Sequence, residues 1–446
     1  MNVGVAKVFH FCRTISFEYY RFYSMMRLPR MVASFHGNSL MTTVTSRIAE
    51  ARQPMAGAGV SPRALRNVLS LHDFEARARR ILPRPIFGYV SGAAEDNRTL
   101  DDNRAVFDEY GLLTRVLRDV SRRQQTVELF GQRFASPFGI APMGINALST
   151  YRGDIVLARA AKAAGIVSIM SGSSLIPLEE VAEAAPGTWF QAYIPGDHAR
   201  ISALLERIAR AGYRTLVITV DIPVSANREN NVRAGFSTPL RPSLRLCWDG
   251  LTRPRWLLGT FARTLAAHGM PHFENSFATR GAPILSANVL RDFSARDHLN
   301  WEHLARIRQQ WKGELIIKGI LSVEDAVIAR EAGADGIILS NHGGRQLDGA
   351  TSPMRILRDV VQAMGSEYPV MVDSGFRRGA DVLKALALGA RMVFVGRPFN
   401  YAAAVAGEAG VTHAIRLLQE EIDRNMAMVG ANGCDELTSD LLIRRR

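Results

Sequence analysis

Short runs of apolar, mostly β-branched residues recur along the chain from about residue 137, and most of them end in a polar or titratable side chain. The runs do not alternate with polar residues, which is typical of strands buried on both faces of a parallel sheet. Eight such runs occur, over residues 138–142, 167–171, 189–194, 215–221, 314–319, 336–341, 369–375 and 392–397.

Stretches rich in Ala, Leu and Glu separate these runs, and most of the stretches stop at a glycine, as helices often do. Eight strands with helices between them predict an α/β fold, namely a (β/α)8 TIM barrel. A doubly wound open sheet is the alternative. Such a sheet ordinarily carries a glycine-rich turn after its first strand, whereas here Pro142 stands at that position.

Residues 1–65 lie outside this pattern, because they show no sustained period and contain few acids. We predict that they form a poorly ordered N-terminal extension or a targeting segment. Residues 66–446 are predicted to form the barrel domain. This domain opens with a helix that starts near Leu71 and ends before Pro83.

Residues 238–300 are too many for an ordinary connection between the fourth and fifth strands, so we predict a long insertion there. The insertion mixes arginines with Trp248, Trp256 and other apolar residues. Arginine suits anionic lipid head groups, and tryptophan suits the membrane boundary. The insertion is therefore either a membrane-contact segment or a lid over the site, and the sequence leaves both interpretations open.

The composition of the 446 residues is 47% hydrophobic and 22% charged, which is typical of a folded globular protein and excludes disorder for most of the chain. No run approaches eighteen apolar residues, so we expect no membrane-spanning helix. The cysteines, Cys12, Cys247 and Cys434, are odd in number and far apart, and they indicate neither a disulfide framework nor a metal site.

The formal net charge of +13 would suggest nucleic acid as a partner if it were spread over the barrel. Residues 1–60, 238–300 and 444–446 carry +5, +4 and +3, which leaves +1 for everything else. The excess is therefore peripheral, and no aromatic-basic platform accompanies it. We expect no nucleic-acid partner.

The seventh and eighth strands end in two similar loops, DSGFRRGAD and GRPF, which pair glycine with arginine directly before a helix. Backbone N–H groups beside glycine and the N-terminus of a helix both bind anions, and these two loops are the usual phosphate site of a barrel. Gly375, Arg377, Gly396 and Arg397 are therefore predicted to bind a phosphate group.

The sixth strand ends in SNHGGRQLDGA, in which glycines separate His342 from Arg345. A histidine at a strand end can act as a base, and the arginine can pair with a carboxylate. Asp221, which ends the fourth strand, is a candidate to orient the histidine ring. Lys318 ends the fifth strand inside an apolar run, and it is either a Schiff-base nucleophile or a fixed positive charge beside an electron-rich cofactor.

The motifs IIKGILSVEDA, SNHGGRQLDGA, DSGFRRGADVLKALALGA and GRP resemble the FMN-dependent 2-hydroxy acid dehydrogenase and oxidase family. This family includes L-lactate dehydrogenases, glycolate oxidase and mandelate dehydrogenase. The resemblance covers roughly residues 70–440 and extends to APMG, WFQAY, TVDIPVSANRE and ILPRPIFGYVSGAAEDNRTL. It implies FMN as the cofactor, a 2-hydroxy acid as the substrate and a homotetramer.

The resemblance also implies a role for each matching residue at the substrate. His342 takes a proton from the bound 2-hydroxy acid, and Asp221 supports it. Arg345 pairs with the substrate carboxylate with the help of Tyr89, and Tyr193 hydrogen-bonds the substrate hydroxyl or the developing carbonyl oxygen. The family leaves open whether the α-hydrogen leaves as a proton or as a hydride.

Further positions follow from the same resemblance. Arg228 adds a second positive group near the carboxylate, and Lys318 stabilises the anionic reduced flavin. The residues implied to line the flavin ring are Pro142, Gly144, Ser171, Gln191 and Thr219. The residues implied to hold the phosphate are Asp373, Gly375, Arg377, Gly396 and Arg397.

Two registers are open for the tyrosine near the start of the resemblance. Counting back from Thr99 and Leu100 places the tyrosine of the family at Tyr89, whereas counting from Ser91 places it at Gly88. We prefer Tyr89, because this register needs no gap and leaves a tyrosine in place.

We therefore expect FMN-dependent oxidation of a small L-2-hydroxy acid, with L-lactate as the leading substrate, to the 2-oxo acid. Electrons would pass from the reduced flavin to a quinone, a cytochrome or oxygen. The alternatives are glycolate or mandelate oxidation and, in a different class, an FMN-dependent barrel isomerase, which would not need His342, Arg345 and Asp221 together. The expected location is cytoplasmic, either free or peripheral on the inner face of the cell membrane.

Overall fold

Eight parallel strands form the centre of the computed structural model, which describes residues 63–237, 241, 243–286 and 296–445. The strands are hydrogen-bonded in the order β4-β11-β10-β9-β8-β7-β6-β5, and a parallel bridge between Ile140 and Ser168 joins the two ends of that order. The ring is therefore closed, and the predicted (β/α)8 barrel is confirmed. The strands are β4 (Phe138–Ile140), β5 (Ile169–Ser171), β6 (Trp189–Ala192), β7 (Thr215–Thr219), β8 (Glu314–Ile320), β9 (Gly336–Leu339), β10 (Val370–Val372) and β11 (Met392–Val395).

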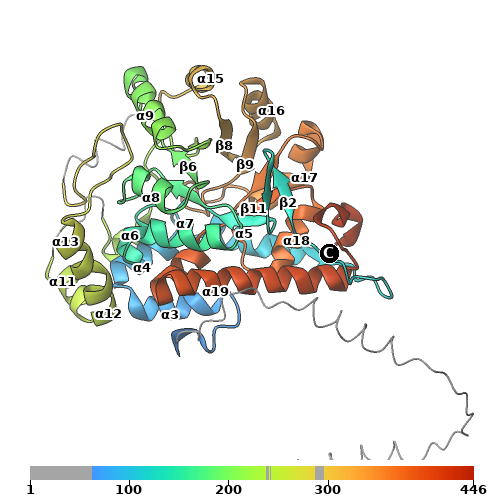
Figure 1. Ribbon diagram of the computed structural model, residues 1–446, viewed down its shortest axis with the longest axis horizontal. Coiled ribbons are helices and arrows are strands. Elements are labelled where there is room, and N and C mark those ends of the chain that lie inside the picture. Colours follow the sequence, from blue (N-terminus) through green and yellow to red (C-terminus); the bar gives the residue numbers. More distant parts are fainter. Residues whose placement is uncertain (1–62, 238–240, 242, 287–295, 446) are drawn as a thin grey trace, which may run out of the picture. The chain divides into compact units, whose positions relative to one another are not determined.

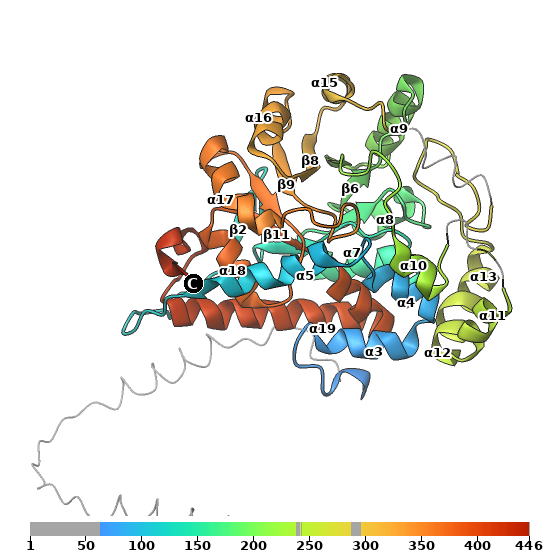
Figure 2. The same ribbon diagram turned by 180° about the vertical axis from the view of Figure 1, so that it is seen from behind.

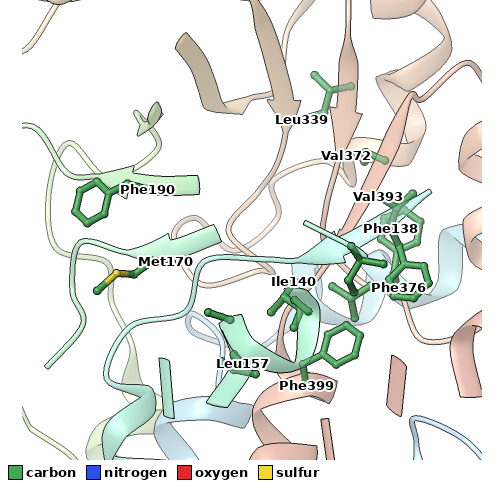
Figure 3. Close-up of a cluster of buried hydrophobic side chains, with 14 of the residues drawn as sticks. Phe138, Ile140, Leu157, Met170, Phe190, Leu339, Val372, Phe376, Val393 and Phe399 are labelled. Atoms are coloured by element: carbon green, nitrogen blue, oxygen red, sulfur yellow. The ribbon is translucent and has the colours of Figure 1, made fainter. Parts of the chain in front are cut away.

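The barrel strands are buried on both faces, since successive side chains point to opposite sides of a strand. Ile316 belongs to a cluster inside the ring that contains residues of the barrel strands, residues next to their ends and residues of a small hairpin, but no helix residue. Leu315 and Ile317 pack outward together with helix residues. Figure 3 shows part of this outer cluster, where the rings of Phe138 and Phe399 stack with centroids 6.3 Å apart. Burial on both faces explains why the strands are continuously apolar in sequence.

Helices surround the ring on its outside (Figure 1). The predicted helices between the strands are confirmed. The covering helices are α6 (Asn146–Ser149), α7 (Gly153–Ala163), α8 (Leu178–Ala184), α9 (His198–Arg210), α15 (Trp301–Gln310), α16 (Val323–Glu331), α17 (Pro353–Met364), α18 (Gly379–Ala387) and α19 (Arg397–Val429).

The elements that precede the barrel lie partly along α19, against which α3 packs (Figure 2). They are η1 (Arg63–Leu65), α3 (Asp73–Ile81), α4 (Arg84–Ser91), α5 (Arg98–Ala105) and η2 (Val106–Glu109). The helix predicted from Leu71 is α3, and Pro83 follows its end. Apart from η1, the predicted extension over residues 1–65 lies outside the described residues.

Two small antiparallel sheets complete the fold. β2 (Val127–Leu129) and β3 (Gln132–Phe134) form a hairpin that contributes to the cluster inside the ring. β1 (Tyr110–Leu112) pairs with β12 (Leu442–Arg444), so part of the C-terminal arginine run is a strand. Two short 3-10 turns, η4 (Cys434–Glu436) and η5 (Ser439–Leu441), precede β12.

The insertion between β7 and β8 forms helices at the side of the barrel (Figure 1). Trp256 fixes it there, since its indole N–H donates to the carbonyl oxygen of Leu148 at 2.6 Å. Arg255 donates to the carbonyl oxygen of Val405 at 3.0 Å. In the part of the chain described, no helix has the length and apolarity needed to cross a membrane. The elements after β7 are α10 (Glu229–Ala234), α11 (Leu244–Leu251), α12 (Pro254–Trp256), the π-helical η3 (Leu257–Ala262) and α13 (Arg263–His268).

Candidate active site

The carboxyl ends of the barrel strands open into a cavity of about 860 Å³, which lies within the ~300–1,000 Å³ range of small-molecule sites. The predicted residues that line it are Tyr89, Pro142, Gly144, Tyr193, Arg228, Lys318, His342, Arg345, Asp373, Gly375, Arg377, Gly396 and Arg397. Ser171, Gln191, Thr219 and Asp221 are not among the lining residues, although each lies at or near the end of its strand.

His342 occupies a tightly folded loop after β9. His342, Gly343 and Gly344 have positive φ angles of 58°, 67° and 78°, and this conformation is strained for a residue that has a β-carbon. A β-carbon at Gly344 would lie 2.7 Å from the backbone nitrogen of Leu100 in α5. The loop therefore packs against α5 so closely that Gly344 must be glycine, and this packing holds the backbone of His342 in a strained conformation.

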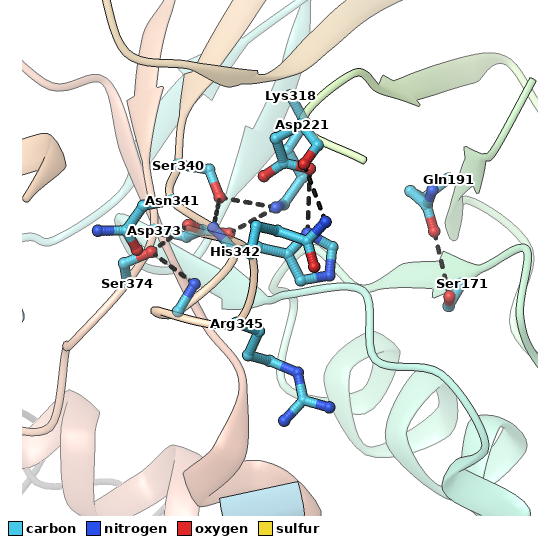
Figure 4. Close-up of polar contacts among 12 residues, drawn as sticks. Ser171, Gln191, Asp221, Lys318, Ser340, Asn341, His342, Arg345, Asp373 and Ser374 are labelled. Carbon is cyan, nitrogen blue, oxygen red and sulfur yellow. Dashed lines mark hydrogen bonds and ion pairs between the residues drawn. The ribbon is translucent and has the colours of Figure 1, made fainter. Parts of the chain in front are cut away.

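His342 and Asp221 are brought together as predicted. Nδ1 of His342 lies 3.1 Å from Oδ1 of Asp221 (Figure 4). Because Nδ1 faces the carboxylate, Nε2 is the ring nitrogen that can accept a proton from a substrate.

Burial lowers the pKa of His342 below its ordinary value of 6.5, although Asp221 opposes this effect and raises it. Burial raises the pKa of Asp221, but the neighbouring charges of His342 and Lys318 outweigh burial and bring this pKa below its ordinary value. Near neutral pH, His342 is therefore a neutral base and Asp221 is an anion.

Lys318 is buried, and its ammonium group has two described partners. Nζ lies 2.8 Å from Oγ of Ser340 and 3.2 Å from Oδ2 of Asp373. Burial lowers the pKa of Lys318, but Asp373 and Asp221 outweigh burial and raise it above the ordinary value. A protonated amine is not a nucleophile, so the structure favours the fixed positive charge over the Schiff base.

Arg345 and Arg228 bring two guanidinium groups to the cavity. Nη1 of Arg345 donates to the carbonyl oxygens of Tyr89 and Gly92 at 2.6 and 2.8 Å. Nε of Arg228 donates to the carbonyl oxygen of Arg345 at 3.0 Å. Burial and the charge of Arg228 lower the pKa of Arg345 to about 9. A bound anion would relieve both effects, so this pair suits a carboxylate.

The geometry favours Tyr89 over Gly88 as the site tyrosine. The guanidinium carbon of Arg345 lies 4.8 Å from the centroid of the Tyr89 ring, and a β-carbon at Gly144 would lie 3.3 Å from the Tyr89 hydroxyl. A β-carbon at Gly88 would instead lie 2.2 Å from that of Ala234. Position 88 therefore faces α10, whereas Tyr89 lines the cavity.

Two further guanidinium groups, those of Arg377 and Arg397, lie at the loops after β10 and β11. Nη1 of Arg377 donates to the carbonyl oxygen of Phe376 at 3.0 Å, and Nε of Arg397 donates to that of Val90 at 3.0 Å. Among the described residues, no carboxylate forms an ion pair with either arginine. Burial lowers the pKa of Arg377 to about 10 and also lowers the pKa of Arg397. These two side chains therefore suit an anionic ligand.

The other residues predicted for the cofactor differ in their surroundings. Asp373, implied to hold phosphate, is paired with Lys318 rather than with the arginines. A β-carbon at Gly375 would lie 2.0 Å from the carbonyl oxygen of Asn103, so this position requires glycine. Oγ of Ser171 donates to Oε1 of Gln191 at 3.1 Å (Figure 4).

Several residues in or beside the cavity escaped sequence reasoning. Ser340 accepts from Lys318 and from the backbone N–H of His342. Ser374 accepts from the backbone N–H of Gly343 at 3.1 Å. Both serines lie in the motifs that contain the predicted site residues, so their positions in those motifs could have identified them. Arg296 reaches the cavity from the insertion, and no signal in the sequence distinguished it from the other arginines there.

The barrel and its cavity define a class of protein, namely a barrel enzyme with a base–carboxylate pair and an anion-binding end. Residues 78–444 match the model of the FMN-dependent dehydrogenase family. The chain belongs to this family of oxidoreductases, and FMN is its cofactor. The isomerase alternative is therefore not supported.

Relatives of known activity are similar over most of the chain. An L-lactate dehydrogenase of Ectopseudomonas mendocina (strain ymp) is 41% identical over 378 residues, which cover 84% of this chain and 98% of the relative. The (S)-mandelate dehydrogenase of Pseudomonas putida is 39% identical over 378 residues, which cover 84% and 94%. A crystal structure of the monotopic membrane protein (S)-mandelate dehydrogenase matches with a TM-score of 0.78 at 38% identity, and covers 85% of this chain and 100% of that one.

Donors in the cavity and directly behind its lining fit FMN. Nε2 of Gln191 is buried and has no hydrogen-bond partner among the described residues, and a buried donor without an acceptor is costly. An acceptor on a bound cofactor would satisfy it. The guanidinium groups of Arg377 and Arg397 suit the phosphate, and the ammonium group of Lys318 suits the electron-rich ring.

Proposed function

We propose that this protein uses FMN to oxidise a small L-2-hydroxy acid to the 2-oxo acid, with L-lactate as the leading substrate. The observation that carries this proposal is the His342–Asp221 pair in one site with the guanidinium groups of Arg345 and Arg228. Removal of a proton from an alcohol that bears a carboxylate requires a base and an anion-binding group together. The similarity to an L-lactate dehydrogenase favours lactate.

At the substrate, Arg345 pairs with the carboxylate, and Arg228 and Tyr89 assist it. The hydroxyl of Tyr193 donates a hydrogen bond to the substrate oxygen. Nε2 of His342 takes the proton, and the carboxylate of Asp221 stabilises the imidazolium that results.

When bound, FMN supplies an acceptor for two electrons. Lys318 would supply a fixed positive charge to the electron-rich ring, and Asp373 fixes the ammonium group of Lys318. The residues proposed to line the ring are Pro142, Gly144, Ser171, Gln191 and Thr219. The residues proposed to hold the phosphate are Gly375, Arg377, Gly396 and Arg397.

Anaerobic titration of the FMN-loaded protein tests this proposal. L-lactate should bleach the flavin absorbance, whereas D-lactate should not. The proposal is wrong if none of L-lactate, glycolate and (S)-mandelate reduces the flavin.

(S)-mandelate is the second candidate substrate, because aromatic side chains form part of the cavity wall. The rings of Tyr89 and Phe236 lie 4.6 Å apart, and Phe273 also lines the cavity. Such walls suit a substrate that carries an aromatic ring. The ratio of kcat/KM for L-lactate to that for (S)-mandelate decides between the two.

The insertion is proposed to contact an anionic membrane surface peripherally. Leu244, Trp248 and Leu251 recur at the spacing that places them on one face of α11, and their exposed fractions are 92%, 67% and 63%. Arg245 and Arg255 are exposed in the same segment. Exposed apolar and basic side chains together suit lipid head groups. The membrane-protein character of the (S)-mandelate dehydrogenase structure supports this proposal.

Vesicle co-sedimentation tests the membrane proposal. The protein should bind vesicles that contain an anionic lipid, and the double variant Leu244→Ser/Trp248→Ser should lose binding while it retains turnover with a soluble acceptor. Leu117→Ser is the matched control, since Leu117 is fully exposed elsewhere on the barrel domain. Equal binding by the double variant and the control would contradict the proposal.

A membrane quinone is the acceptor that such a surface would reach most directly, and cytochrome c and oxygen are the alternatives. Steady-state rates with each acceptor in turn separate the three. The homotetramer stays a prediction, which light scattering of the FMN-loaded protein would test.

A further inference from the structure

The insertion returns to the barrel beside the active site and brings a buried arginine into it. Arg296 lines the cavity, and its guanidinium carbon lies 4.9 Å from the centroid of the Tyr193 ring. Only 8% of Arg296 is exposed. A cation over an aromatic face is attracted to the ring, and the attraction grows as water is excluded.

A second contact holds the same two segments together. Tyr193 belongs to the loop between β6 and α9, and so does Gly196. The carbonyl oxygen of Gly196 lies 2.9 Å from Nε2 of His298. The backbone N–H of Leu299 donates to the carbonyl oxygen of Arg296 at 3.1 Å, which closes a turn around His298. The stack of Arg296 on Tyr193 is therefore one of several contacts between the end of the insertion and the loop between β6 and α9.

The charges around Tyr193 show how the contact with Arg296 affects the acidity of the phenol. Burial raises the pKa of Tyr193, and Tyr89 and Asp221 raise it as well. Lys318 and Arg296 oppose them and lower it. A positive charge near a phenol stabilises the ionised form, which makes the hydroxyl more acidic and a stronger hydrogen-bond donor.

We propose that Arg296 is a positioning residue for the reaction. It holds the ring of Tyr193 at the cavity and strengthens the hydrogen bond that the Tyr193 hydroxyl donates to the substrate oxygen. This inference rests on the proposed role of Tyr193 in 2-hydroxy acid oxidation. It also gives the insertion a part in catalysis that is separate from any contact with a membrane.

Two variants of Arg296 separate the charge from the shape of the side chain. Arg296→Gln keeps a planar polar head without the charge, and Arg296→Lys keeps the charge without the planar head. In the FMN-loaded enzyme, Arg296→Gln should lower kcat about tenfold while KM stays within about twofold and the FMN content is unchanged. Arg296→Lys should recover most of kcat. A side chain that is needed only for its planar head would give the reverse order.

Arg200→Gln is the matched control, because the guanidinium carbon of Arg200 also lies over an aromatic ring, at 5.4 Å from the centroid of Phe277. Neither Arg200 nor Phe277 lines the cavity. The control variant should keep both kcat and KM.

A double-mutant cycle with Tyr193→Phe tests whether Arg296 acts through the phenol. In the Tyr193→Phe background, Arg296→Gln should cost little further activity, since the hydroxyl that it strengthens is absent. The same tenfold loss in both backgrounds, or unchanged kcat in Arg296→Gln alone, would overturn the inference. Unaltered turnover in Tyr193→Phe would overturn the role of Tyr193 itself, which is the part taken from the proposed function.

If Arg296→Gln does not yield folded protein, Arg296→Lys decides alone. Its kcat should stay within about threefold of the wild-type value. A larger loss with normal FMN content would contradict a role for the charge.

Discussion

The two ends of the active-site cavity hold their charged side chains in opposite ways. At the catalytic end the base and the ammonium group each have a carboxylate partner within the protein, since His342 lies against Asp221 and Lys318 pairs with Asp373. At the phosphate end, the described hydrogen bonds of Arg377 and Arg397 go to backbone carbonyls. The first end is preorganised for chemistry before any ligand binds.

This difference assigns different consequences to mutations at the two ends. Loss of a matched charge at the catalytic end removes chemistry and leaves its partner buried without compensation. Loss of an arginine at the phosphate end removes a contact to the cofactor and relieves crowding among like charges. Changes at the first end should therefore appear in kcat, and changes at the second in the affinity for FMN.

The largest expected effect is that of His342→Gln at the catalytic end. The variant should retain FMN but lose about a thousandfold or more in kcat, because no neutral base remains to take the substrate proton. Single-turnover flavin reduction by L-lactate measures this directly. FMN binding with the wild-type affinity is the internal control, and turnover within tenfold of the wild type would remove His342 from the role of base.

Asp221→Asn should cost about a hundredfold in kcat/KM, since the imidazolium loses the carboxylate that stabilises it. The pH dependence gives a second, signed readout. The base works when neutral, so activity is present above the pKa of His342 and is lost as the pH falls through it. Burial places this pKa below 6.5, and Asp221 raises it. The acid limb of kcat/KM should therefore lie below pH 6.5 in the wild type and move lower in Asp221→Asn, and a limb that moves upward would contradict the pairing.

Arg377→Met and Arg397→Met probe the phosphate end. Each should weaken FMN binding about tenfold to a hundredfold, the amount expected for the loss of a charge-assisted contact to phosphate. At saturating FMN, kcat should stay within about threefold of the wild type, because neither side chain belongs to the catalytic pairs. Equilibrium titration of the apoprotein with FMN supplies the affinity. A loss of kcat at full FMN occupancy would erase the distinction between the two ends.

Most of the catalytic end could be predicted from the sequence, because parallel strands bring their carboxyl ends to one side of the sheet. His342, Asp221 and Lys318 each end a separate apolar run, so the fold alone predicts that they converge. The partners of Lys318 were harder to predict. Asp373 and Ser340 follow neighbouring strands, but only the register of β8 to β10 shows which carboxylate meets the ammonium group.

The contributions from outside the barrel could not be predicted. Arg296 reaches Tyr193 only because the long insertion returns over the loop between β6 and α9. Phe236 meets Tyr89 because α10 packs against α4. Neither of these contacts produces a periodic pattern in the sequence, because each depends on how a segment without repeats folds back onto the barrel.

The smallest expected effect lies at Gly144, on the catalytic side of the cavity. A β-carbon there would lie 3.0 Å from that of Ser173 and 3.3 Å from the Tyr89 hydroxyl, and both neighbours can move by a few tenths of an ångström. Gly144→Ala should therefore change the KM for L-lactate and the affinity for FMN by no more than about threefold each. Gly250→Ala is the control, because its β-carbon would make only an ordinary 3.6 Å contact with Trp256 in the insertion. A tenfold loss of FMN affinity in Gly144→Ala would instead show that position 144 belongs to the FMN-binding part of the cavity and not to the catalytic end beside Tyr89.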